Sequence, residues 1–301
     1  MSLIEISNDS LSATVSTLGG TLLRFSAHQH GKWLDILRPT PVDEATPAMQ
    51  SACFPLVPFG NRVSGNRFDH AGKRYTLTPN QSWDPHYVHG DGWLNAWTAA
   101  ATQKDALTLV YEHAASSATP YSYRAQQRFV LSGNTMELTL SVTNLGVPLP
   151  FGLGWHPYFV LDPDTLLTAP AASHWLEGEH YLPTEQVSIP VELDFNEPRS
   201  LPRRWVNNGF AGWTHHAQIV WPSRALALTI NAEQADYYFL FVGDTDFDPS
   251  YRHDYFCFEP MTHAADSHSH PALRGLLPLQ TGDTTELSMR WTASPADGVS
   301  S

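Results

Sequence analysis

The chain has 301 residues, of which 42% are hydrophobic, and a formal net charge of −13 from 17 basic and 30 acidic residues. Nucleic acids and anionic membranes are bound through clustered Lys and Arg, so this balance argues against both as partners and against a highly phosphorylated substrate, although one local Arg could hold a single phosphate. No stretch approaches the roughly 18 apolar residues of a membrane span, and residues 1–10 have neither a basic region nor an apolar run, so we expect a cytoplasmic protein.

Alternating apolar and polar residues predict strands, beginning with Leu11, Ala13 and Val15 before a turn at Gly19-Gly20. Two long segments flank Ser132-Gly133-Asn134, which predicts a three-residue hairpin loop. The predicted strands after the first are 106–111, 124–131, 135–143, 217–221, 225–231, 237–243, 254–259 and 285–292. No segment shows sustained helical periodicity, and 23 Pro and 19 Gly interrupt the strands, which predicts an all-β sandwich or barrel.

The chain shows no linker, repeat or shift in composition, so we predict one domain over residues 1–294. Residues 295–301 are small and polar and are expected to form a disordered tail. The stretch 162–212 is rich in Pro, His and Trp and predicts long loops over the sandwich. Cys53 and Cys257 are expected to be reduced, partly buried thiols.

Four polar clusters interrupt apolar, strand-like sequence. They are Asn61-Arg62 after a Phe-Pro-Leu run, His89-Gly90-Asp91-Gly92-Trp93, Gly154-Trp155-His156-Pro157-Tyr158-Phe159, and Phe258-Glu259-Pro260. Burying such groups unpaired costs roughly 2–7 kcal/mol, so each is either partnered or functional. For each cluster alone, a structural histidine or ion pair is about as good an explanation as a binding site. Together, a guanidinium, two imidazoles and a carboxylate beside aromatic rings suit a neutral polyhydroxy ligand, because rings cover the C–H faces of a sugar and polar groups bind its hydroxyls.

His156 and Glu259 are the candidate proton carriers. Burial lowers the pKa of an imidazole and a nearby carboxylate raises it, so the pKa of His156 can end near neutrality, which suits a proton donor. Burial would raise the pKa of Glu259 and make its carboxylate a stronger base.

The ordered set of motifs resembles the aldose 1-epimerase (galactose mutarotase) family. The matching segments are the turn Thr17-Leu18-Gly19-Gly20, the run from Phe54 to Arg62, His89 to Trp93, Gly154 to Phe159, and Phe258 to His263. The resemblance implies a large antiparallel β-sandwich of the galactose-mutarotase type that needs neither a metal nor an organic cofactor.

The resemblance also implies roles for single residues. Glu259 matches the catalytic base of the family and His156 its catalytic acid, while Arg62 and His89 match residues that hold the sugar. Four further side chains are predicted to contact the sugar: Asn61, Asn207, Trp155 and Tyr158. Trp213 is another candidate for stacking on it.

Asn207 marks a departure from the family pattern. The family usually has an Asp that binds sugar hydroxyls three residues before a Phe, and here Asn207 precedes Phe210. An amide forms hydrogen bonds but carries no charge, so we expect catalysis to carry over and substrate preference to differ.

A histidine-rich segment contains His263, Asp266, His268 and His270. Its intervening Ala, Ser and Pro residues predict a mobile surface loop, and no zinc-like ligand spacing accompanies it, so we predict no metal site.

The leading hypothesis is a monomer or homodimer that interconverts the α and β anomers of a small neutral aldose such as galactose or glucose. A non-catalytic sugar-binding or sensor protein on the same fold is an alternative. A hexose-6-phosphate mutarotase is another, but it needs a second basic group that the sequence does not identify. A hydrolase would need two carboxylates flanking the bond and a lyase acting on uronates a basic cluster, which makes both less favoured.

Overall fold

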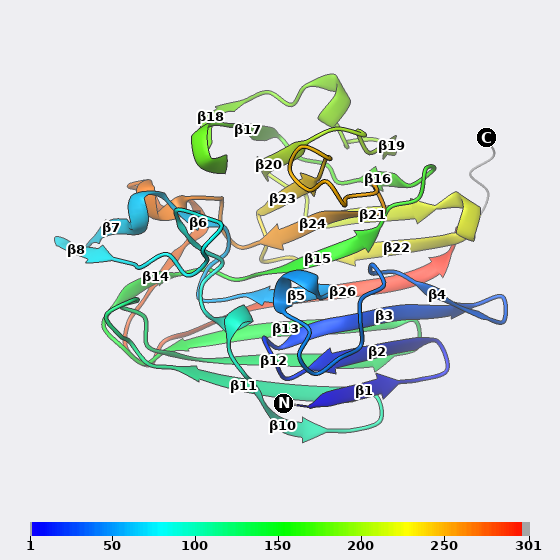
Figure 1. Ribbon diagram of the computed structural model, residues 1–301, viewed down its shortest axis with the longest axis horizontal. Coiled ribbons are helices and arrows are strands. Elements are labelled where there is room, and N and C mark those ends of the chain that lie inside the picture. Colours follow the sequence, from blue (N-terminus) through cyan, green and yellow to red (C-terminus); the bar gives the residue numbers. More distant parts are fainter. Residues whose placement is uncertain (1, 297–301) are drawn as a thin grey trace.

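The computed structural model describes residues 2–296, and within that range it contains strands and short 3-10 helices. None of the helices in these residues is both long enough and apolar enough to cross a membrane. Two large antiparallel sheets dominate the molecule, and Figure 1 shows them with β15 and β24 near the middle. The prediction of an all-β sandwich is therefore confirmed.

The first sheet has eleven strands in the order β1-β2-β3-β5-β15-β24-β23-β20-β17-β18, with β4 paired to β3. Their bounds are β1 (Leu3–Ser7), β2 (Leu11–Ser16), β3 (Thr21–Gln29), β4 (Lys32–Asp35), β5 (Cys53–Leu56), β15 (Gly154–Val160), β17 (Ser173–Glu177), β18 (Pro183–Val187), β20 (Val206–Ala211), β23 (Tyr237–Val242) and β24 (Tyr255–Met261).

The second sheet has nine strands in the order β10-β11-β12-β13-β26-β22-β21-β16-β19. Their bounds are β10 (Thr98–Thr102), β11 (Ala106–His113), β12 (Tyr123–Ser132), β13 (Thr135–Asn144), β16 (Leu166–Thr168), β19 (Arg199–Ser200), β21 (His216–Trp221), β22 (Leu226–Asn231) and β26 (Thr284–Pro295).

Three two-stranded sheets and eight 3-10 helices complete residues 2–296. The small sheets pair β14 (Leu149–Phe151) with β25 (Leu277–Leu279), β6 (Arg62–Val63) with β9 (Tyr87–Val88), and β7 (Arg67–His70) with β8 (Lys73–Thr76). The helices are η1 (Ala48–Gln50), η2 (Ser64–Asn66), η3 (Gly92–Leu94), η4 (Glu179–Tyr181), η5 (Val191–Leu193), η6 (Pro222–Arg224), η7 (Ser267–Ser269) and η8 (Leu273–Gly275).

The core lies between the two large sheets, where alternate side chains of each strand meet. In β13 the side chains of Leu138 and Leu140 are fully buried, as the alternation of that segment predicts. Trp291 of β26 packs against Phe25 of β3 and Phe159 of β15, with ring centroids 5.8 and 5.5 Å apart, and so joins the sheets.

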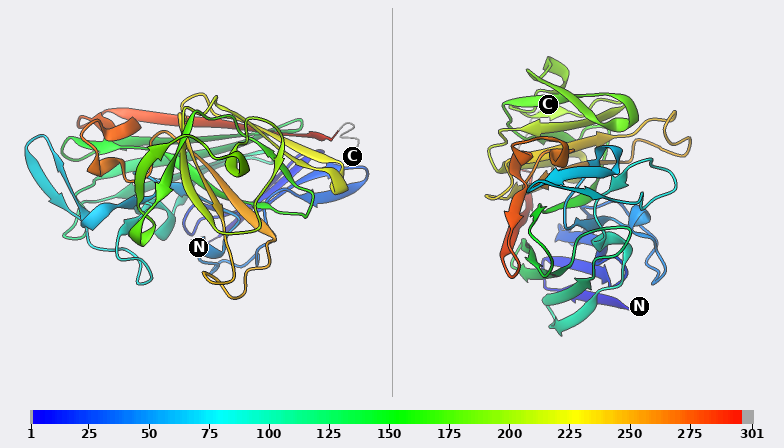
Figure 2. Two further views of the ribbon diagram at one scale, coloured as in Figure 1. Left: turned by 90° about the horizontal axis from the view of Figure 1, so that it is seen from above. Right: turned by 90° about the vertical axis from the view of Figure 1, so that its left-hand side faces the viewer.

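Loops on the other side of the first sheet surround the functional region. The loop of residues 77–86 and the loop of residues 243–254 project from the same side of the molecule in both views of Figure 2. Trp83 of the first loop and Phe247 of the second line one cavity. The outer face of the first sheet is therefore the floor of a walled site.

Several local predictions were wrong. Residues 162–212 are not long loops, because β17, β18 and β20 extend the first sheet and β16 and β19 the second. The hairpin loop between β12 and β13 has two residues, since Ser132 pairs with Thr135. Strand β26 reaches Pro295, which pairs with Leu226, so the first residue assigned to the tail belongs to a strand, while residues 297–301 lie outside the described range.

The histidine-rich segment is not a mobile surface loop. His263 accepts a hydrogen bond from the Gly60 amide at 2.9 Å, and His268 Nε2 lies 2.9 Å from the hydroxyl of Tyr121. Both imidazoles are buried, and His268 packs between the rings of Phe59 and Phe68. Burial lowers the pKa of His263 to about 4 and that of His268 to about 3, so both serve as neutral, hydrogen-bonded core residues.

Candidate active site

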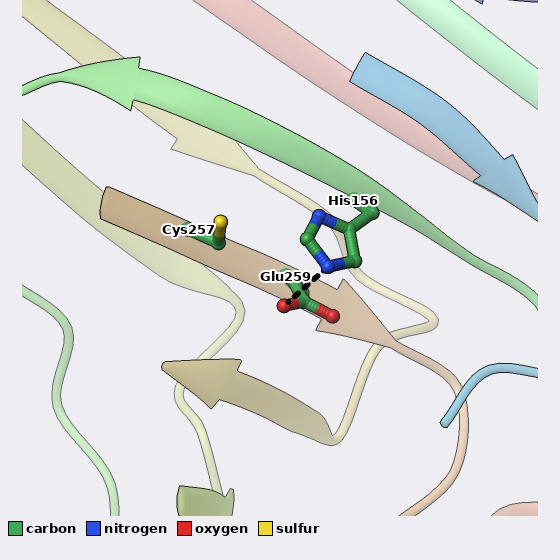
Figure 3. A group of neighbouring side chains, drawn as sticks. All are labelled: His156, Cys257 and Glu259. Carbon is green, nitrogen blue, oxygen red and sulfur yellow. Dashed lines mark ion pairs between the residues drawn. The ribbon is translucent and has the colours of Figure 1, made fainter. Parts of the chain in front are cut away.

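The site begins with the pairing of two central strands, β15 and β24. Gly154 pairs with Met261 and Tyr158 with Cys257, which places His156 beside Glu259 on the same face of the sheet. Figure 3 shows the side chains of His156, Cys257 and Glu259 projecting from these strands toward one another. Both strands are buried on their two faces, because the core covers one face and the cavity walls shelter the other.

His156 and Glu259 form a close buried pair. His156 Nε2 lies 3.2 Å from Glu259 Oε1, and their side chains are 10% and 2% exposed. Neither His156 Nδ1 nor Glu259 Oε2 has a hydrogen-bond partner among residues 2–296. The pair is therefore well placed to exchange protons with a ligand.

Burial acts on the two groups in opposite directions. It raises the pKa of the Glu259 carboxyl well above its ordinary value of 4.5, which the charge of Arg62 opposes. Burial, followed by the charge of Arg38, lowers the pKa of His156 to about 3. Burial therefore favours a protonated Glu259 carboxyl beside a neutral His156 imidazole.

Asn61 and His89 hold each other in place above this pair. The backbone N–H of Asn61 donates to His89 Nδ1 at 3.1 Å, and the backbone N–H of His89 donates to the backbone carbonyl of Asn61 at 2.9 Å. Because Nδ1 accepts, the neutral ring of His89 carries its proton on Nε2 and offers a donor. The His89 ring lies 5.3 Å from that of His156 and nearly perpendicular to it. Gly90 follows with a φ of +68°, where a Cβ would lie 2.3 Å from the Val57 carbonyl oxygen.

Arg62 is held by Asp84. Arg62 Nε donates to Asp84 Oδ2 at 2.8 Å, and the Asp84 side chain is 1% exposed. Asp84 Oδ1 accepts from the His86 amide, which fixes the carboxylate in turn. The Arg62 guanidinium also lies 5.0 Å from the ring of Tyr181. This leaves Arg62 oriented toward the cavity with its charge balanced.

Asn207 and Tyr158 also line the cavity. Asn207 Nδ2 donates to Glu177, whose carboxylate also accepts from the Trp205 indole at 3.0 Å. A carboxylate is thus present next to the position where Asn207 replaces the expected Asp. The Tyr158 ring packs against that of His156 with centroids 4.7 Å apart.

The prediction that Trp155 contacts the sugar is wrong. Successive residues of a strand point to opposite faces, so Trp155 points away from the side of the sheet that His156 faces. Its ring is 1% exposed within the core between the sheets, and its indole nitrogen lies 3.3 Å from Gln127 Oε1 of β12. Trp213 is likewise a core residue and does not line the cavity.

The cavity over this floor has a volume of about 890 Å³. It is lined by the pair, by Arg62, Asn61, His89, Asn207 and Tyr158, and by aromatic side chains of the walls. Phe239 and Arg38 are among the lining residues that the sequence analysis did not identify. Phe239 pairs with Glu259 across β23 and β24, and Arg38 precedes Pro39 directly after the apolar Ile36-Leu37. The same pattern, a charged residue between an apolar run and a proline, had singled out Glu259 and would have found Arg38.

Cys257 lies close to His156 and Glu259, and the three residues are of types that can bind a metal ion. One ligand atom each of His156, Cys257 and Glu259 lie within 4.8 Å of one another. A metal-binding imidazole usually donates its other ring nitrogen to a fixed partner, which His156 Nδ1 lacks within residues 2–296. Burial and the neighbouring Glu259 raise the pKa of the Cys257 thiol, which favours its protonated form. The set suits proton transfer better than metal binding. Cys53 and Cys257 are both free thiols and fully buried, rather than partly buried.

The family model described as aldose 1-epimerase matches residues 2–292. A curated relative, the uncharacterized protein YphB of Escherichia coli strain K12, is 46% identical over 298 residues, which cover 96% of this chain and 99% of the relative. The chain belongs to the aldose 1-epimerase family. This establishes the family that the motifs resembled.

Solved structures of the family agree with the fold. A crystal structure from Escherichia coli K12, provisionally described as an aldose 1-epimerase, has a TM-score of 0.92 and 45% identity, covering 98% of this chain and 99% of its own. A galactose mutarotase-like protein from Clostridium acetobutylicum has a TM-score of 0.81 over 97% of this chain and 95% of its own, at 17% identity, and so supports the fold alone.

Proposed function

We propose that this aldose 1-epimerase family member interconverts the α and β anomers of a free aldose. The observation that carries the proposal is the buried contact of 3.2 Å between His156 Nε2 and Glu259 Oε1 on the floor of a cavity. Ring opening of a sugar requires one proton to leave the anomeric hydroxyl and one to reach the ring oxygen. A carboxylate and an imidazolium side by side are suited to both transfers.

In the proposed step Glu259 takes the proton from the anomeric hydroxyl while His156 gives a proton to the ring oxygen. The C1–O5 bond breaks, and C1 becomes an aldehyde. Rotation about the C1–C2 bond then presents the other face of the aldehyde. Closure reverses both proton transfers and yields the other anomer.

The proton count of the pair is the same before and after ring opening. Glu259 gains one proton from the anomeric hydroxyl and His156 gives one to the ring oxygen, so the form that follows ring opening has a protonated carboxyl and a neutral imidazole, which is also the form that burial favours. The form that starts the reaction is a carboxylate beside an imidazolium. Donation from sugar hydroxyls to the carboxylate stabilises that charged form, as the buried site requires.

The remaining polar residues hold the sugar in this scheme. His89 offers its Nε2 proton, Arg62 offers the guanidinium nitrogens that Asp84 leaves free, and Asn61 and Asn207 offer amides. Phe239 provides a ring surface for the C–H face of the sugar, whereas the two faces of the Tyr158 ring are covered by Arg38 and His156.

The test follows the exchange of the two anomers with and without purified protein. Fresh solutions of α-D-glucose and α-D-galactose are followed by polarimetry at neutral pH. Acceleration that is lost in Glu259→Gln supports the proposal. Sugar binding without acceleration by the wild-type protein would refute it and favour a binding protein on the same fold.

A further inference from the structure

Arg38 differs from the other arginines of the cavity. Arg62 forms an ion pair with Asp84, and Arg224 forms one with Asp162. Among residues 2–296, no carboxylate oxygen lies within the 4.0 Å of an ion pair from the guanidinium of Arg38. Arg38 therefore brings to the cavity a guanidinium that forms no ion pair with an acidic side chain of residues 2–296.

The guanidinium of Arg38 is nonetheless fixed. Its Nε donates to the Ser51 carbonyl at 3.0 Å, and its Nη2 donates to the Met49 and Ser51 carbonyls at 2.7 Å each. It stacks on the ring of Tyr158 at 3.5 Å and lies 4.6 Å from that of Tyr255. Within the described part of the chain Nη1 has no hydrogen-bond partner, so a preorganised donor is left for a ligand.

Arg38 lies on the His156 side of the catalytic pair proposed above, and this position indicates which part of the sugar it would meet. After burial, the charge of Arg38 is the larger influence on the pKa of His156 and that of Arg62 a smaller one, while Arg62 also acts on Glu259. The Tyr158 ring lies between the guanidinium and His156. Arg38 is thus on the side of the pair where His156 meets the ring oxygen. In a pyranose, the carbon next to that oxygen on the far side from C1 is C5, and the substituent on C5 is two bonds from the ring oxygen.

We propose that Arg38 binds a carboxylate carried on C5 of the sugar, so that the preferred substrate is a hexuronate rather than the neutral hexose expected from composition. This inference rests on the proposed anomer interconversion. A carboxylate fits better than a phosphate because one unneutralised guanidinium matches one negative charge. Asp248 and Asp254 line the same cavity and repel any anion there, but they repel a phosphate more strongly because of its second charge.

The assignment links binding to catalysis. While Arg38 is unpaired, its charge disfavours the imidazolium form of His156. A carboxylate that pairs with Arg38 removes this repulsion when the sugar is in place. A hexuronate should therefore show a higher kcat as well as a lower KM than the matching neutral hexose.

The experiment measures exchange between the α and β H1 signals by NMR magnetisation transfer at equilibrium, which needs no pure anomer. The sugars are D-glucose, D-glucuronate and D-glucose 6-phosphate, and the proteins are the wild type, Arg38→Met and Arg204→Met. Methionine keeps an apolar side chain over Tyr158 but removes the charge. Arg204 is exposed, pairs with Glu192 at 3.3 Å and does not line the cavity, so it controls for loss of one positive charge.

The expected result is a wild-type preference for glucuronate over glucose in kcat/KM. Arg38→Met should lower that ratio roughly 10- to 100-fold, the value of a charged hydrogen bond, while Arg204→Met should leave it unchanged. Equal losses on both sugars would make Arg38 merely structural and overturn the inference. A preference for glucose 6-phosphate would overturn the choice of a carboxylate. Exchange of glucose without a preference for glucuronate refutes only the role of Arg38, whereas no acceleration with any sugar refutes the proposed function.

Discussion

Replacing Glu259 with Gln should sharply lower turnover and yet make the protein progressively more stable, relative to wild type, as the pH rises. The carboxyl group is 2% exposed, and burial raises its pKa well above its ordinary value of 4.5. Above that ordinary value the unfolded chain has lost the Glu259 proton, while the folded protein keeps it. The folded state then binds more protons than the unfolded state, so wild-type stability falls as the pH rises.

The magnitude follows from linkage. One proton of difference changes the free energy of unfolding by about 1.4 kcal/mol per pH unit, over the range above 4.5 in which the folded carboxyl stays protonated. The amide introduced by Glu259→Gln does not titrate, so the difference between variant and wild type should grow with this slope. Burial of that amide adds a constant offset of roughly 1–3 kcal/mol, which leaves the slope unaffected. His156 is present in both proteins, and its own contribution cancels to first order.

The assay is urea unfolding followed by tryptophan fluorescence at several pH values over this range. Glu5→Gln, at an exposed carboxylate of β1, controls for the chemical change itself. Anomer exchange by Glu259→Gln should fall by about 10²–10⁴-fold, the usual contribution of one general base. Parallel curves of unfolding free energy against pH for wild type and Glu259→Gln would show that Glu259 is ionised in the folded protein and would refute the reasoning.

Three further predictions test the rest of the site. His156→Asn should lower the anomer-exchange rate by about 10²–10⁴-fold, because the ring oxygen loses its proton donor. An unchanged rate, measured by polarimetry, would contradict this role of His156. Asp84→Ala should lower the unfolding free energy by about 3–5 kcal/mol, because it leaves the charge of Arg62 unpaired in a buried setting, and urea unfolding measures the loss. Trp155→Phe should leave the KM for sugar unchanged and cost about 1–3 kcal/mol of stability, because the buried Gln127 side-chain oxygen loses its indole donor, whereas a raised KM would indicate that Trp155 contacts the sugar.

Local patterns predicted the fold well because a half-buried strand carries its burial pattern in its own sequence. The alternation in β13 is an example, and its buried face matches the prediction. The alternation of side chains along a strand could also have prevented the wrong assignment of Trp155. Trp155 and His156 are neighbours in an extended segment, so they cannot both face one cavity. The sequence interpretation grouped them as one motif and so assigned both to the sugar.

The site residues that could not be predicted from the sequence depend on contacts with residues far away along the chain. Phe239 reaches the site because β23 pairs with β24, and this register depends on the whole sheet. Arg38 reaches it because its guanidinium stacks on Tyr158, more than a hundred residues further along the chain. The burial of His263 and His268 likewise depends on Gly60 and Tyr121, far away in sequence. In each case the residue type was visible in the sequence, but the partner that determines its role was not.

The site places its acid and base in direct contact, and this has a consequence for specificity. Burial favours the neutral form of the pair, which is not the form that opens a closed sugar ring in the proposed mechanism. The ligand must therefore shift the proton from Glu259 to His156 as it binds. Hydroxyl donors can stabilise the carboxylate, but they do nothing for the imidazolium while Arg38 stands unpaired beside it. On the proposed mechanism, a sugar that brings its own negative charge to Arg38 would stabilise both halves of the productive pair, so we expect discrimination between sugars to act through His156 as well as through contact with Arg38.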